Sequence, residues 1–85
     1  LIDISDLDTA IARMVAALRP GGTLLIANLN SFTTAGHPDG WTRDADGTMR
    51  YAIDHYMDER PIWQDWRGIR IRNWHRPLST YMTLL

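Results

Sequence analysis

The chain has 85 residues, ten of them acidic and nine basic, and its formal net charge is −1 at pH 7. This length leaves room for no more than one small domain, and the charge excludes the basic footprint of a nucleic-acid-binding protein or a polybasic membrane patch. No apolar run reaches the roughly 20 residues that span a bilayer, and the absence of cysteine excludes disulfides and thiolate metal sites. We therefore expect a cytoplasmic protein that binds neither nucleic acid nor membrane.

Residues 5–18 carry the pattern of an amphipathic helix. The apolar side chains that recur on one face at helical spacing are Leu7, Ile11, Met14, Val15 and Leu18. Ser5 is the expected N-cap, with Asp8 three residues later as a short form of the capping box. Pro20 prevents continuation of the helix, and the two glycines that follow it favour a tight turn.

Residues 23–29, TLLIANL, follow that turn and are apolar at neighbouring positions rather than at alternate ones. This pattern is typical of a strand that is buried on both faces, as in a parallel sheet flanked by helices. We therefore predict an α/β fold in which residues 1–30 supply a helix and a central strand.

Residues 31–47 are polar and rich in glycine, which predicts a loop, with a turn at the sequence DADG in residues 44–47. His37 in this loop has no partner at the spacing of metal ligands, and no glutamate follows the DADG sequence at the spacing of a calcium loop. We therefore predict no metal site.

Residues 48–74 alternate apolar and polar side chains in two runs, 49–58 and 62–74, with a turn signal between them at residues 58–61. This pattern predicts one antiparallel hairpin, with Gly68 marking a bulge in its second strand. Residues 75–85 then have the apolar spacing of the start of another helix.

Two segments resemble class I S-adenosylmethionine-dependent methyltransferases, in particular the methyltransferase type 11 branch. The first is ALRPGGTLLI, residues 17–26, which is similar to the helix end, turn and fifth strand of the seven-stranded Rossmann-like sheet in that family. The second is the order of MDER, residues 57–60, and WHRPLSTY, residues 74–81, which resembles a hairpin followed by the start of the next helix.

The resemblance implies that residues 1–85 are a partial methyltransferase domain from the C-terminal half of the fold. The glycine-rich cofactor motif of the family is missing, and the chain begins without methionine and has apolar residues at both ends. The longer parent protein would bind S-adenosyl-L-methionine and transfer its methyl group to a small-molecule acceptor. We expect the segment alone to be inactive and not to bind the cofactor.

Two asparagines follow the predicted strand at its carboxyl end, where open α/β sheets bind ligands. Asn28 is a candidate for cofactor binding and Asn30 for substrate binding. Asparagine also caps loops and turns frequently, so a structural role for both side chains stays open.

Four further polar residues are candidates because their side chains suit acid–base chemistry or anion binding. His75 and His55 are candidate catalytic bases, and Tyr56 and Arg76 are candidate substrate-binding residues. The alternatives are that His75 caps the last helix, that Arg76 pairs with an aspartate, and that His55 packs within the hairpin.

A second hypothesis is a non-enzymatic α+β module that forms homo-oligomers. Its basis is the pair of apolar chain ends and four tryptophans, which are numerous for this length. A weaker third hypothesis is a fragment of a nicotinamide-binding oxidoreductase, since an apolar parallel strand fits that class as well.

Overall fold

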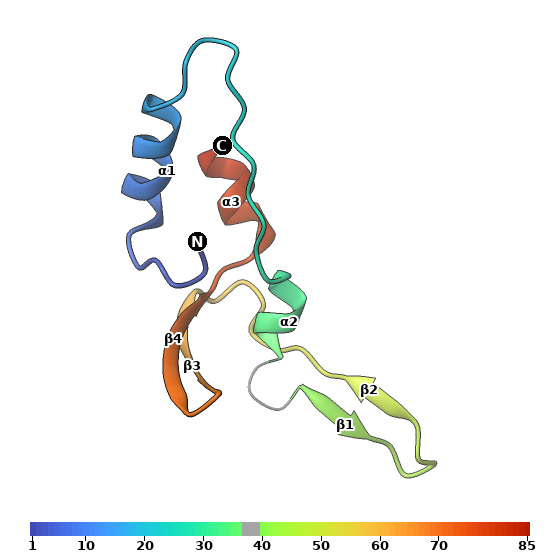
Figure 1. The fold of residues 1–85 in the computed structure, drawn as a ribbon. Helices are drawn as coiled ribbons and strands as arrows, with labels where there is room; N and C mark the ends of the chain where they lie inside the picture. The colour runs from blue at the N-terminus through green and yellow to red at the C-terminus, as the bar shows by residue number, and fades with distance from the viewer. Residues whose placement is uncertain (37–39) are drawn as a thin grey trace.

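The computed structural model describes residues 1–36 and 40–85, so His37 lies outside the described residues (Figure 1). The described part is a small α+β arrangement of three helices and two antiparallel hairpins. The helices are α1 (Leu7–Ala16), α2 (Ser31–Ala35) and α3 (Leu78–Leu84), and the strands are β1 (Trp41–Arg43), β2 (Met49–Tyr51), β3 (Arg60–Trp66) and β4 (Ile69–His75). In residues 1–36 and 40–85, no helix combines the length and apolar character needed to cross a bilayer.

Helix α1 confirms the first predicted helix but is shorter than residues 5–18. Its N-cap is Asp6 rather than Ser5, because the Asp6 carboxylate accepts a hydrogen bond from the Thr9 backbone N–H at 3.2 Å. Hydrogen bonding from the Thr9 side chain, and next from its backbone N–H, lowers the pKa of the Asp6 carboxyl below its ordinary value. The turn after the helix contains Gly21 with a φ of 74°, a conformation that favours glycine.

The prediction of a paired central strand at residues 23–29 is wrong for the described residues. The segment is extended, but neither of its edges pairs with another strand. The Leu25 side chain is 90% exposed and that of Leu29 is 52% exposed. A strand of this kind requires neighbours on both edges, and both two-stranded sheets of the described part use other residues. The Rossmann-like sheet is therefore not observed.

The predicted loop at residues 31–47 contains regular structure. Helix α2 begins directly after Asn30, and strand β1 pairs with β2 in the register Trp41↔Tyr51. The predicted turn within this region is confirmed: Gly47 has a φ of 86°, and its N–H donates to the Asp44 carbonyl at 2.9 Å.

The single hairpin predicted over residues 48–74 is wrong, because there are two hairpins. Strand β2 pairs with β1, and residues 60–75 fold back on themselves as β3 and β4. The reversal occurs at Arg67 and Gly68, with φ values of 49° and 80°. Two consecutive positive φ angles are typical of a type I′ turn, so Gly68 forms the turn and not a bulge.

The apolar core is small and is continued by buried polar side chains. The buried apolar residues of the described part are Leu7, Ile11, Ala35, Ile62 and Pro77. The buried polar residues are Ser31, Thr34, Asn73, His75 and Arg76. Polar contacts thus position the elements to a greater extent than apolar packing does.

The predicted final helix is confirmed as α3, and Figure 1 shows it beside the extended segment that precedes α2.

Tyr51 fixes the β1–β2 hairpin to helix α2. Its hydroxyl donates to the Thr33 carbonyl at 2.6 Å, and its ring covers Gly36 and Gly40. A Cβ atom on Gly40 would lie 2.5 Å from the ring carbon Cζ, and a Cβ atom on Gly36 would also collide with this ring. Glycine is required at both positions because the aromatic ring occupies the space of a side chain.

We predict that Gly40→Ala destabilises the protein by about 1–3 kcal/mol, since the methyl group overpacks the Tyr51 contact. Urea denaturation of the Gly40→Ala, Tyr51→Ala and double variants measures this cost. Once the ring has been removed, adding Gly40→Ala should cost less, and the cost that remains comes from the Gly36 carbonyl oxygen, 2.8 Å from the new Cβ atom. An equal cost in both backgrounds would contradict the proposed packing.

Candidate functional site

His75 is the centre of the buried polar cluster. Its side chain is fully buried at the end of β4. Nε2 lies 2.8 Å from the Tyr56 carbonyl oxygen, and Nδ1 lies 2.7 Å from Thr34 Oγ1. A carbonyl oxygen only accepts hydrogen bonds, so Nε2 carries the hydrogen. The single hydroxyl hydrogen of Thr34 lies within reach of both His75 Nδ1 and the Ser31 carbonyl oxygen, which is 3.1 Å from Thr34 Oγ1. Both nitrogens are occupied, which favours a structural role for this candidate base.

Tyr56 joins the same cluster through its ring and its hydroxyl. The ring stacks on Phe32 with centroids 5.2 Å apart and meets His75 edge-on at 5.8 Å. The hydroxyl accepts from the Leu78 backbone N–H at 3.1 Å, at the first residue of α3. The structure thus brings together two predicted site residues, Tyr56 and His75, and uses both to connect α2, β4 and α3.

Arg76 is 3% exposed and points toward the N-terminal turn. Its Nη2 donates to the carbonyl oxygens of Ile4 at 2.6 Å and Ser5 at 3.0 Å. Its Nη1 is buried without a hydrogen-bond acceptor in the described part of the chain. The guanidinium also lies 5.5 Å from the centroid of the Trp74 ring. The salt bridges of the described residues do not include Arg76, so its predicted alternative role as an aspartate partner is not observed.

His55 lies outside the cluster and is exposed. Its backbone has a φ of 50°, in the left-handed region, and its N–H donates to the Asp54 side chain at 2.7 Å. The ring nitrogen Nδ1 is 3.2 Å from the Asp58 carboxylate. This arrangement stabilises the turn before β3, so His55 is neither packed within a hairpin nor next to the other candidate base.

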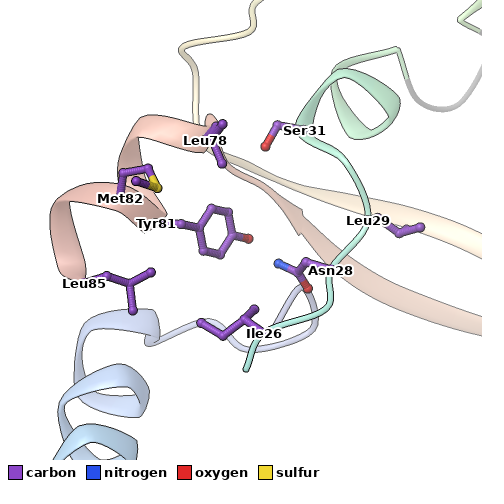
Figure 2. A pocket seen from close by; sticks show the side chains of 8 residues that line it. All are labelled: Ile26, Asn28, Leu29, Ser31, Leu78, Tyr81, Met82 and Leu85. Carbon is purple, nitrogen blue, oxygen red and sulfur yellow. The ribbon is translucent and has the colours of Figure 1, made fainter. Parts of the chain in front are cut away.

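An open cavity of about 280 Å³ lies between the extended segment and α3 (Figure 2). Its lining residues are Ile26, Asn28, Leu29, Ser31, Leu78, Tyr81, Met82 and Leu85. Figure 2 shows the Tyr81 ring projecting from α3 toward the Asn28 amide. The cavity is therefore mainly apolar, with polar groups at one side. Asn30 does not line it, because the Asn30 side chain caps α2 by accepting from the Phe32 N–H at 2.8 Å.

The six predicted site residues occupy four separate environments. His75 and Tyr56 are in contact, and Asn28 lines the cavity. Asn30 and Arg76 each form hydrogen bonds with backbone groups, and His55 is exposed. Sequence reasoning missed Thr34 and Phe32 because both lie in the predicted loop. The available signal was the order Asn30, Ser31, Phe32, in which an asparagine cap precedes a short helix.

The cavity suits an apolar ligand that carries one or two hydrogen-bonding groups. Among the described residues, no group of three or more histidine, cysteine, aspartate or glutamate side chains is arranged to hold a metal ion. No protein-family model matches the sequence, and comparisons with curated proteins and with solved structures found no match.

We predict that Thr34→Val destabilises the protein by about 1–3 kcal/mol, because it leaves the buried Nδ1 of His75 without a partner. The control is Thr33→Val, since Thr33 precedes it on the same helix and is exposed. Urea denaturation compares the two variants. Equal stability of both variants would show that the His75 hydrogen bond does not hold the cluster together.

Proposed function

We propose that the chain is part of a class I S-adenosylmethionine-dependent methyltransferase that methylates a small-molecule acceptor. The order of elements supports this proposal: helix α1, the Pro20-Gly21-Gly22 turn, an extended apolar segment, the β3–β4 hairpin and helix α3 follow one another as the resemblance implies. Helix α2 and the β1–β2 hairpin are additional elements between the extended segment and β3. In the longer parent protein, residues 23–29 would pair with neighbouring strands and supply the fifth strand of the seven-stranded sheet.

The exposure of the extended segment is the main observation that supports the proposal. Ile26 lines the cavity against α3, whereas the adjacent Leu25 is 90% exposed. Exposed apolar side chains are unfavourable in water, and the unpaired backbone of the segment leaves both of its edges open to further strands. Strands on its two edges and a second layer on its exposed side would bury these side chains, as in a central parallel strand.

The described residues do not suffice for the cofactor. The polar side chains of the cavity lining are the Asn28 amide and the hydroxyls of Ser31 and Tyr81, and the lining has no carboxylate. In this class the cofactor site includes a glycine-rich turn and an acidic residue that holds the ribose hydroxyls, and the lining of this cavity has neither. Asn28 would contribute one hydrogen bond at the carboxyl end of the strand. The acceptor must lie behind the methyl carbon, so orientation and exclusion of water are the main demands.

Calorimetric titration tests the cofactor assignment. S-adenosylmethionine should bind the full-length parent protein with one site per chain and should not bind residues 1–85 alone. Failure of the full-length protein to bind would contradict the proposed function.

A matched pair of substitutions tests the sheet assignment in the full-length protein. Leu25→Asp should destabilise it by more than about 3 kcal/mol, because an unpaired charge would be buried inside the sheet. Met57→Asp serves as the control, since Met57 is 67% exposed and lies outside the proposed strand at residues 23–29. Urea denaturation measures both, and equal small effects would place Leu25 outside any sheet.

The exposed Leu25 also favours a second candidate function, a module that associates with its own copies. Sedimentation of residues 1–85 distinguishes the two. Concentration-dependent dimers that disappear in Leu25→Asp, together with no cofactor binding by the full-length protein, would favour association over methyl transfer.

A further inference from the structure

The charge of the chain is divided between two regions. Residues 60–76, which comprise β3, β4 and Arg76, contain five arginines and one aspartate. The rest of the chain contains four arginines and nine acidic residues. The net charge is small because the positive charge of residues 60–76 and the negative charge of the other residues nearly cancel.

The basic side chains of β4 fall on one face of the hairpin. Alternate residues of a strand share a face, and the register opposes Arg72 to Trp63 and Arg70 to Asp65. Trp74 continues the row toward Arg76. The face thus presents two arginines beside two tryptophans, and Asp65 is its single acidic residue.

The two arginines of this row are held over aromatic rings. The Arg70 guanidinium lies 4.9 Å from the centroid of the Trp63 ring, and that of Arg72 lies 5.7 Å from the centroid of the Trp74 ring. Both arginines are exposed, and neither forms a salt bridge within the described residues. Stacking uses the flat face of a guanidinium and leaves its N–H edge for an oxygen acceptor.

Two donor atoms at the base of the same row lack acceptors. Trp74 Nε1 and Arg76 Nη1 are buried and have no hydrogen-bond partner within residues 1–36 and 40–85. Arginine and the indole N–H donate but do not accept. The row from Arg70 to Arg76 is therefore a line of donors to which this chain supplies almost no negative charge.

We propose that the Arg70–Arg72 face binds an extended acidic segment of a partner protein, with carboxylates two residues apart. Side chains two residues apart on an extended strand are about 6.6 Å apart, in the partner as in β4, so two carboxylates match two guanidiniums. Single-stranded nucleic acid is disfavoured, because base stacking requires open aromatic faces, whereas guanidiniums lie over the Trp63 and Trp74 rings. This surface does not depend on the proposed methyl transfer.

The test is fluorescence polarisation at low salt with a labelled eight-residue peptide of alternating glutamate and threonine. The double variant Arg70→Gln/Arg72→Gln should lose about tenfold in affinity, because two charge-assisted contacts are removed. The control is Arg13→Gln/Arg19→Gln, which changes the charge equally at two exposed arginines near α1 and should bind as the original protein does. Circular dichroism checks that both variants retain the fold.

Two further probes separate spacing and polymer class from charge. A peptide with the same four glutamates at every third residue should bind several-fold more weakly than the alternating peptide. An eight-nucleotide oligothymidylate should bind more weakly still. The proposal is overturned if the alternating peptide does not bind, if both double variants lose affinity equally, or if the oligonucleotide binds more tightly.

Discussion

The described structure depends on the hydrogen bonds of two consecutive residues, His75 and Arg76. His75 contacts the side chain of Thr34 and the backbone of Tyr56, and Arg76 contacts the carbonyl of Ile4, 72 positions earlier in the sequence. These bonds connect the N-terminal turn, α2, the turn before β3 and the end of β4. They matter here because the buried apolar core is small. In an environment without water, a donor or acceptor that loses its partner costs more than an average hydrogen bond contributes, so this cluster constrains the elements to one arrangement.

Local signals predicted local structure well. The apolar spacing around Leu7 and Ile11 predicted α1, the spacing after Leu78 predicted α3, and the glycine at position 47 marked its turn. Pairing could not be predicted in the same way, because alternation shows that residues form a strand but not which strand is the partner. The pair Arg67-Gly68 illustrates the difficulty. A glycine within an alternating run is compatible with a bulge or with a two-residue turn, and only the register of β3 against β4 decides between them.

The candidate site was predictable in its residue types but not in its geometry. His75 and Tyr56 were identified separately, yet their contact requires the chain to fold back over 19 residues. Thr34 carried no chemical signal, because a threonine in a polar region is ordinary until a buried histidine lies beside it. The two asparagines also show that residue type does not predict geometry. They are two positions apart at the end of the apolar segment, but Asn28 lines the cavity, whereas Asn30 is the N-cap of α2.

The two proposals assign different parts of the molecule to different partners, and the structure keeps those parts separate. The extended segment and α3 present apolar surface and a mainly apolar cavity, which suit burial against further strands and a small acceptor. The β3–β4 hairpin presents stacked arginines, which suit carboxylates in water. The cluster around His75 lies between these regions and covers neither the cavity nor the arginine row. A ligand on the arginine row therefore has no direct contact with Asn28. Arg76 and Pro77 join β4 directly to α3, and the hydrogen bonds of His75 to Thr34 and to the Tyr56 backbone are a second connection between the two regions.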